Sequence, residues 1–137
     1  MRKLLFLFSM LVCAVLNMSA ESVITMTTNK SYGDTFVFNP MPLAEGIISV
    51  DWGDGEKKDY QMSPTMMPYQ LRTEGVLKGN TVKIYGALAE LSVNEQGLTA
   101  LKLEGQSGLK KLNVSKNLLT YATLDLGDAQ NLNVLSW

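Results

Sequence analysis

Residues 88–98 read LAELSVNEQGL, and residues 109–119, 21 positions later, read LKKLNVSKNLL. Residues 132–137 read LNVLSW and begin a third copy, 23 positions after the second. The shared pattern is LxxLxLxxNxL, with Val at the third apolar position and Gln96 in place of Asn in the first copy. A recurring period of this length indicates an internal repeat, in which each copy is one structural unit that stacks on the next. A second apolar pair recurs between the copies, as Leu101 and Leu103 and again as Leu124 and Leu126.

The spacing within each copy favours a short β-strand. Alternate apolar residues of a strand point to one side, so stacked copies would form a continuous apolar column. The asparagine would turn the chain out of the strand while its side-chain amide hydrogen-bonds exposed backbone groups. The alternative is an amphipathic helix, because Leu109 and Leu112 are three residues apart. Gly97, Gly105 and Gly108 lie close by and disfavour a helix, so we predict stacked strand repeats over residues 87–137.

The preceding segment, residues 21–86, has a different rhythm. Short β-rich runs alternate with Gly, Pro and Asp, which predicts a small all-β sandwich. Asp54-Gly55 is a dipeptide favoured in tight hairpins, where both central residues need positive φ. Residues 62–68 contain two prolines and three methionines and are expected to form a loop. The predicted strands cover residues 23–27, 35–38, 47–52, 56–61 and 81–85.

The first twenty residues have the order of a secretory signal peptide. Arg2 and Lys3 precede an apolar run over residues 4–16, and cleavage is expected after Ala20. The run is too short for a membrane anchor, so we expect no membrane span once it is removed. Cys13 raises the possibility of a lipoprotein, but it lies inside the run and follows Val12, so that alternative is not favoured. The predicted location is therefore secreted or at the cell surface.

Composition excludes several kinds of chemistry. The sequence has no histidine, and Cys13 is its one cysteine, so residues 21–137 hold no Cys/His zinc site and no Ser-His-Asp or Cys-His pair. Removal of Arg2 and Lys3 from the twelve basic residues leaves ten against thirteen acidic ones. This charge balance lacks the basic surface that nucleic-acid binding requires. We therefore predict a protein that is not an enzyme, with no catalytic residues, cofactor, metal or nucleic-acid partner.

The hairpin segment contains the acidic residues Asp51, Asp54, Glu56 and Asp59. Such carboxylates can bind calcium, or as a pair hydrolyse glycosides, or merely hold a turn. The spacing does not fit the usual calcium loop, and so small a domain offers little room for a glycosidase cleft, which favours the turn. Trp52, Tyr60 and Tyr69 offer a second choice, between an aromatic platform for sugar rings and a core position for Trp52. Trp52 alternates with Val50 on one face of the predicted strand, which favours the core position.

The repeats resemble the leucine-rich-repeat family, and the VDWGDG segment at residues 50–55 resembles the WDFGDG hairpin of PKD-type immunoglobulin-like domains. The combination is similar to exported repeat proteins of gut bacteria. The resemblance implies a mainly β fold, with a PKD-like sandwich (21–86) followed by a short leucine-rich-repeat solenoid (87–137). It also implies that outward side chains of the repeat strands bind partners. Those residues are Glu90, Ser92, Asn94, Lys111, Asn113, Ser115, Val134 and Ser136.

These observations together predict a secreted or surface-exposed binding protein whose repeat face holds a protein partner. One alternative is a carbohydrate-binding accessory module that uses the sandwich to hold a glycan. Another is a purely structural cap for a longer solenoid. Because Trp137 falls in mid-pattern, we expect the repeat array to be truncated and its open last copy to favour self-association.

Overall fold

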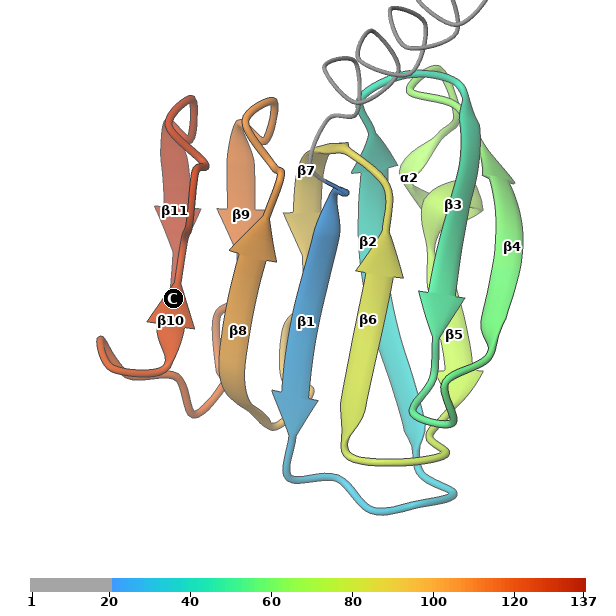
Figure 1. Ribbon diagram of the computed structural model, residues 1–137, viewed down its shortest axis with the longest axis vertical. Coiled ribbons are helices and arrows are strands. Elements are labelled where there is room, and N and C mark those ends of the chain that lie inside the picture. The colour runs from blue at the N-terminus through green and yellow to red at the C-terminus, as the bar shows by residue number, and fades with distance from the viewer. Residues whose placement is uncertain (1–20) are drawn as a thin grey trace, which may run out of the picture.

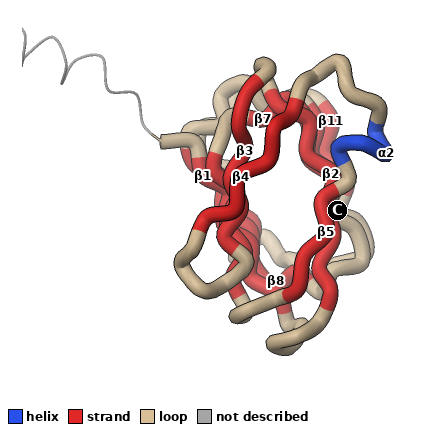
Figure 2. Tube along the Cα trace, turned by 90° about the vertical axis from the view of Figure 1, so that its right-hand side faces the viewer, coloured by secondary structure: helices blue, strands red, loops and turns tan. Residues whose placement is uncertain are grey.

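The computed structural model describes residues 21–137, and the predicted signal peptide and Cys13 lie outside this range. The protein is mainly β, with its strands arranged in two sheets that face each other (Figures 1 and 2). This arrangement agrees with the predicted β-sandwich. Within residues 21–137, no helix has the length and apolar character that crossing a membrane would take.

The larger sheet has six strands in the order β10-β8-β1-β6-β3-β4. The β1, β8, β6, β3 and β4 strands pair antiparallel, whereas β10 lies parallel to β8. The bounds of these strands are β1 (Val23–Thr28), β3 (Gly46–Asp51), β4 (Lys57–Met62), β6 (Thr81–Tyr85), β8 (Leu98–Glu104) and β10 (Leu124–Asp125).

The smaller sheet has five strands in the order β11-β9-β7-β2-β5. A short helix, α2 (Pro68–Leu71), lies outside this sheet near β2 (Figure 2). Neither α2 nor β5 was predicted from the sequence. The bounds of the strands are β2 (Thr35–Pro42), β5 (Thr73–Val76), β7 (Leu88–Ser92), β9 (Lys111–Asn113) and β11 (Val134–Ser136).

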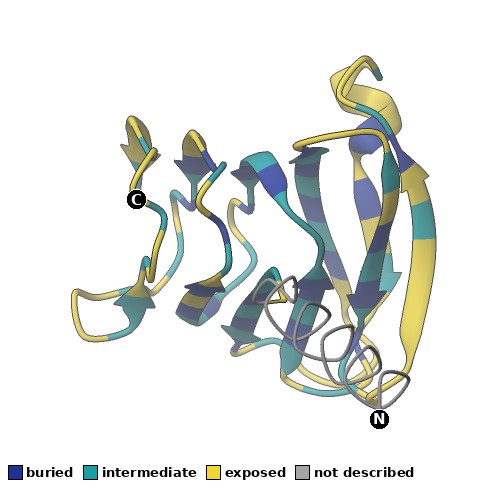
Figure 3. Cartoon of the chain, turned by 45° about the horizontal axis from the view of Figure 1, so that its top comes forward, coloured by how far each residue is buried: buried dark blue, intermediate teal, exposed yellow. Residues whose placement is uncertain are grey.

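One apolar core fills the space between the sheets, because alternate residues of the strands point inward. Ile24 and Met26 of β1 are fully buried, as are Leu88, Leu109 and Leu112 from the repeats. Burial decreases towards the end of the chain, and the last repeat is mostly exposed (Figure 3). Leu135 occupies the same register position as Leu112 but is 38% exposed.

The three copies of the sequence repeat lie side by side in parallel register. Leu91 pairs with Leu112 and Leu112 with Leu135, so the offsets of 21 and 23 residues appear directly in the sheet. The first copy continues both sheets of the preceding segment, since β7 pairs antiparallel with β2 and β8 with β1. The division into two domains between residues 86 and 87 stays a prediction. Each sheet contains strands from both sides of this boundary (Figure 1).

The predicted asparagine turn is present at Asn117. Its Nδ2 donates to the backbone carbonyls of Val93 at 2.7 Å and Val114 at 2.9 Å, and its Oδ1 accepts from the N–H groups of Gln96 and Leu98. The side chain therefore satisfies backbone groups of its own copy and of the preceding one. The residues that precede each turn, Glu95 and Lys116, are both in the left-handed region, with φ of 55° and 60°.

Two glutamines hold the first copy in place. Gln96 stands at the position of Asn117, and its Oε1 accepts from the N–H of Val37 in β2 at 3.0 Å. Gln106 is fully buried; its Oε1 accepts from the N–H of Leu88 and its Nε2 donates to the carbonyl of Gly86. These two side chains connect the first repeat to the segment before it.

The β3–β4 hairpin is confirmed, but its turn differs from the prediction. The strands end at Asp51 and restart at Lys57, so the loop has five residues rather than the three left between the predicted strands. Gly53 and Gly55 have positive φ, of 119° and 84°, whereas Asp54 does not. The prediction of positive φ for both residues of Asp54-Gly55 was wrong at Asp54, because the glycines on either side provide the turn.

Candidate binding face

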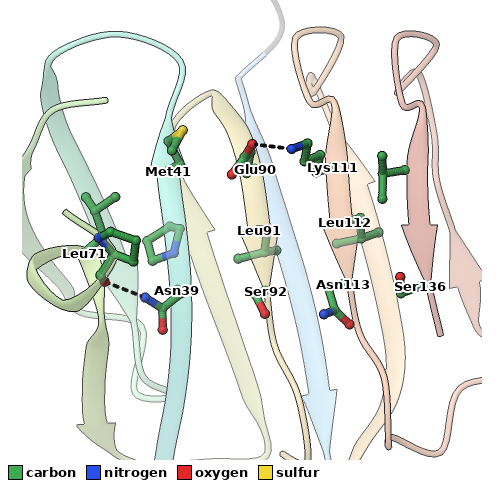
Figure 4. Close-up of a pocket in the computed structure, with 13 residues that line it drawn as sticks. Asn39, Met41, Leu71, Glu90, Leu91, Ser92, Lys111, Leu112, Asn113 and Ser136 are labelled. Carbon is green, nitrogen blue, oxygen red and sulfur yellow. Dashed lines mark hydrogen bonds and ion pairs between the residues drawn. The ribbon is translucent and has the colours of Figure 1, made fainter. Parts of the chain in front are cut away.

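The outer face of the five-stranded sheet carries a hollow of about 390 Å³ between α2 and the repeat strands (Figure 4). Its floor comes from four neighbouring strands, β2, β7, β9 and β11, and its wall from α2. The hollow is therefore formed jointly by the predicted sandwich and the predicted repeats. The residues that line it are Asn39, Pro40, Met41, Pro68, Leu71, Glu90, Leu91, Ser92, Lys111, Leu112, Asn113, Val134 and Ser136.

Short polar side chains form one row across the floor. Asn39 pairs with Ser92, Ser92 with Asn113, and Asn113 with Ser136, so each strand contributes one member. We call these four residues the polar row. Neighbouring strands are about 4.8 Å apart, so the row presents uncharged hydrogen-bonding groups at a regular interval.

A second row runs beside the first, through Met41, Glu90, Lys111 and Val134. Lys111 Nζ lies 3.5 Å from Glu90 Oε1, and both side chains are partly exposed. An exposed pair of this kind contributes little to stability, but the two charges offset each other. The floor of the hollow therefore carries no net charge.

The end of the hollow beside α2 is apolar. Met41 of β2 and Pro68 and Leu71 of α2 are among its lining residues, and Asn39 Nδ2 donates to the carbonyl of Pro68 at 2.8 Å. Figure 4 shows Asn39 next to Leu71. This bond ties the first residue of α2 to the outer face of β2. Gln70 further stabilises the helix, since its Oε1 accepts from the N–H of Met67 at 2.8 Å.

The structure brings most of the predicted partner-binding residues together. Glu90, Ser92, Lys111, Asn113, Val134 and Ser136 all line the hollow. Asn94 and Ser115 lie outside it and contact its members: Asn94 Nδ2 donates to Ser92 Oγ, and Ser115 Oγ donates to Asn113 Oδ1.

The sequence did not reveal the contribution of the preceding segment. Asn39 and Met41 come from β2, and Pro68 and Leu71 from α2. Their participation depends on the pairing of β2 with β7, which joins residues about fifty positions apart. A long-range strand pairing of this kind leaves no local signal in a single sequence.

The acidic hairpin holds its own turn, as predicted. Asp51 Oδ1 accepts from the N–H groups of Gly53 and Gly55, at 2.8 and 3.0 Å. Asp54 accepts from the N–H of Glu56, which is the main cause of its lowered pKa, and its carboxylate lies 3.3 Å from Lys78 Nζ. Within the described range, the structure brings no three Asp or Glu side chains together in a group that could hold a metal ion.

The three aromatic residues considered as a sugar platform do not share a surface. Trp52 is 7% exposed, packs against Phe38, and donates from Nε1 to the hydroxyl of Tyr60 at 3.3 Å. Tyr69 is 75% exposed, on α2. The prediction that Trp52 belongs to the core is confirmed.

Comparison with protein-family models, with curated proteins and with solved structures finds no match to this chain.

Proposed function

We propose that this chain is a secreted or surface-exposed, non-enzymatic protein that binds a protein partner on the outer face of its five-stranded sheet. The observation that carries the proposal is the hollow, in which the polar row, an ion pair and an apolar end share one exposed surface. Protein interfaces commonly combine an apolar centre with polar groups around it. The hollow combines both kinds of group, with its apolar part at the α2 end, where exposed Met67 and Tyr69 flank Pro68.

The proposal includes the finer identity of the two segments. Residues 87–137 are proposed to begin a leucine-rich-repeat solenoid, and residues 21–86 to be a PKD-like sandwich. The parallel register of Leu91, Leu112 and Leu135 and the bonds of Asn117 support the first part. The β3–β4 hairpin with its aspartate-held turn supports the second.

A second candidate function, a structural cap, has its own supporting observation. Both sheets of the sandwich pair with the first repeat, and Gln96 and Gln106 bridge the junction. The sandwich would then cover the first edge of the repeats. This role is compatible with binding, since the same strand pairing builds the hollow.

Site-directed photo-crosslinking tests the binding proposal. A photoreactive residue at Ser92, on the proposed face, is compared with one at Thr25, which lies in β1 of the opposite sheet. We expect extracts of the producing cells to yield a protein adduct at Ser92 and none at Thr25. Equal adducts at both positions, or adducts at Thr25 alone, contradict the proposal. Intact-mass measurement of the exported protein tests the predicted start at Glu21.

A further inference from the structure

The proposed binding face has features that define the chemistry of its partner more closely, and the inference below rests on that proposed function. The polar row spans β2, β7, β9 and β11, which is three strand spacings. Three spacings amount to about 14 Å, the length of about four residues of extended polypeptide. The row is thus long enough to contact a short extended segment laid across the strands.

The row has hydrogen-bonding capacity that the fold does not use. Asn113 Oδ1 accepts from the N–H and hydroxyl of Ser115. Within residues 21–137, by contrast, no protein group bonds to Asn113 Nδ2, Asn39 Oδ1 or Ser136 Oγ. The row therefore offers both donors and an acceptor, and an extended backbone presents the matching N–H and C=O groups.

The charges beside the row exclude a strongly charged partner. Glu90 and Lys111 lie within 3.5 Å of each other, and Arg72 near α2 is paired with Glu74 at 2.8 Å. A charged side chain placed over this floor would lose water without gaining an unpaired opposite charge. An uncharged segment meets no such cost.

The apolar end supplies an anchor position. Leu71 of α2 lies beside Asn39, where the row begins, and Met41 lies further along β2, beside Glu90 (Figure 4). One apolar side chain can insert at this β2 end of the hollow while the neighbouring backbone lies over the row. Methionine adapts its shape to different side chains, which suits such a position. We infer that the hollow binds an uncharged, extended segment of a protein, anchored by one apolar side chain between β2 and α2.

The test uses a displayed library of random twelve-residue peptides, selected on residues 21–137. We expect enriched peptides to share an uncharged stretch with one aliphatic or aromatic residue. Fluorescence polarisation of a labelled synthetic peptide then measures affinity. Replacing its apolar residue with Asp, or introducing Met41→Ala or Ser136→Ala in the protein, should weaken binding about tenfold. Within residues 21–137 the Ser136 hydroxyl makes no hydrogen bond, so Ser136→Ala should leave the fold intact. Thr25→Ala in the opposite sheet is the matched control and should leave affinity unchanged.

Several results would overturn the inference. The first is a consensus of charged peptides, and the second is no enrichment of any peptide. The third is binding of a neutral oligosaccharide to this face in place of peptides, and the fourth is a dimer of 21–137 that Ser92→Arg on the hollow dissociates. If the photoreactive residue at Ser92 still captures a protein, the proposed function survives such a result. Peptides that bind Met41→Ala and Ser136→Ala as tightly as the parent protein, together with no adduct at Ser92, contradict both.

Discussion

Asn117 Oδ1 accepts a hydrogen bond at 3.0 Å from the backbone N–H of Gln96, the residue at the equivalent position one repeat earlier. The same oxygen accepts from Leu98, and Nδ2 donates to carbonyls of both repeats. One side chain thus pairs with backbone groups of two bent segments that have no backbone partner in the described part of the chain. Asn117 therefore helps the β7–β9 ladder to hold the first two repeats together.

Asn117→Ala should therefore lower the free energy of unfolding by about 1–3 kcal/mol, because it leaves partly buried backbone groups unpaired. Denaturant unfolding measures this loss, and hydrogen exchange should show faster exchange at Gln96 and Leu98. Asn94→Ala is the control, since Asn94 is exposed and bonds only within its own repeat. Similar losses for the two variants would contradict the bridging role of Asn117.

The apolar column gives a second prediction. Leu112 is fully buried between Leu91 and the last repeat, so Leu112→Ala should cost about 2–5 kcal/mol through lost contacts and a cavity. Lys111 points outward, and Lys111→Ala should change stability by less than about 0.5 kcal/mol. Chemical denaturation of the two variants compares them. Equal effects would show that the inward and outward positions are wrongly assigned.

Gly75 of β5 leaves room for the indole of Trp52. A Cβ at this position would overlap the Trp52 ring, so Gly75→Ala should destabilise the fold by about 1–3 kcal/mol. Thermal unfolding monitored by near-ultraviolet circular dichroism reports on both stability and the tryptophan environment. Glu74→Ala, at the neighbouring exposed position, serves as the control. An unchanged spectrum and midpoint for Gly75→Ala would mean that Trp52 does not pack there.

The hairpin predicts an acid dependence of stability. The N–H of Glu56, followed by Lys78, lowers the pKa of Asp54 below the ordinary aspartate value of 3.8. As pH falls, Asp54 therefore takes up its proton in the unfolded chain before it does so in the folded protein. The contribution of Asp54 to the free energy of unfolding is complete above pH 3.8 and is lost as pH falls through the lowered pKa. Unfolding measured from about pH 5 to about pH 2 should show a smaller decline for Asp54→Asn than for the parent. Glu45→Gln, on an exposed turn, should retain the parent's decline; a parent-like decline in Asp54→Asn would refute the assignment.

Exposed apolar groups on the last repeat predict self-association of the 21–137 polypeptide. Tyr121 is 90% exposed and Trp137 46%, and their rings contact each other edge to face at 5.0 Å. Together with Leu135 they form an apolar surface beside β11, the edge strand of the five-stranded sheet. Analytical ultracentrifugation should detect oligomers that Trp137→Ser weakens and Tyr32→Ser, in an exposed distant loop, does not. A monomer at all concentrations would contradict this.

Local sequence patterns predicted many of the strands, but they did not predict which distant strands pair with each other. Ile24 and Met26 alternate, and the structure buries both in β1 as expected. Leu88, Leu91 and Val93 are likewise buried where the repeat places them. The β5 strand was missed because its TEGV sequence has little apolar character, and its place depends on pairing with β2.

The candidate site was predictable only in its repeat half. Periodicity placed Glu90, Ser92, Lys111 and Asn113 on one face, because equivalent residues of stacked strands share a direction. Asn39 and Met41 could not be assigned in this way, since they join the face through antiparallel pairing. Pro68 gave a loop signal, yet its contact with Asn39 is a tertiary one.

The pairing of β1 with β8 and of β2 with β7 has a mechanical consequence. Domains joined by a flexible linker can reorient, and a ligand held by one then exerts little torque on the other. Here two ladders of backbone hydrogen bonds connect the segments, one in each sheet, and resist both bending and twisting. A load applied to a partner in the hollow would therefore pass through β2 and β7 into the rest of the sandwich, and the face would keep a constant direction relative to the six-stranded sheet.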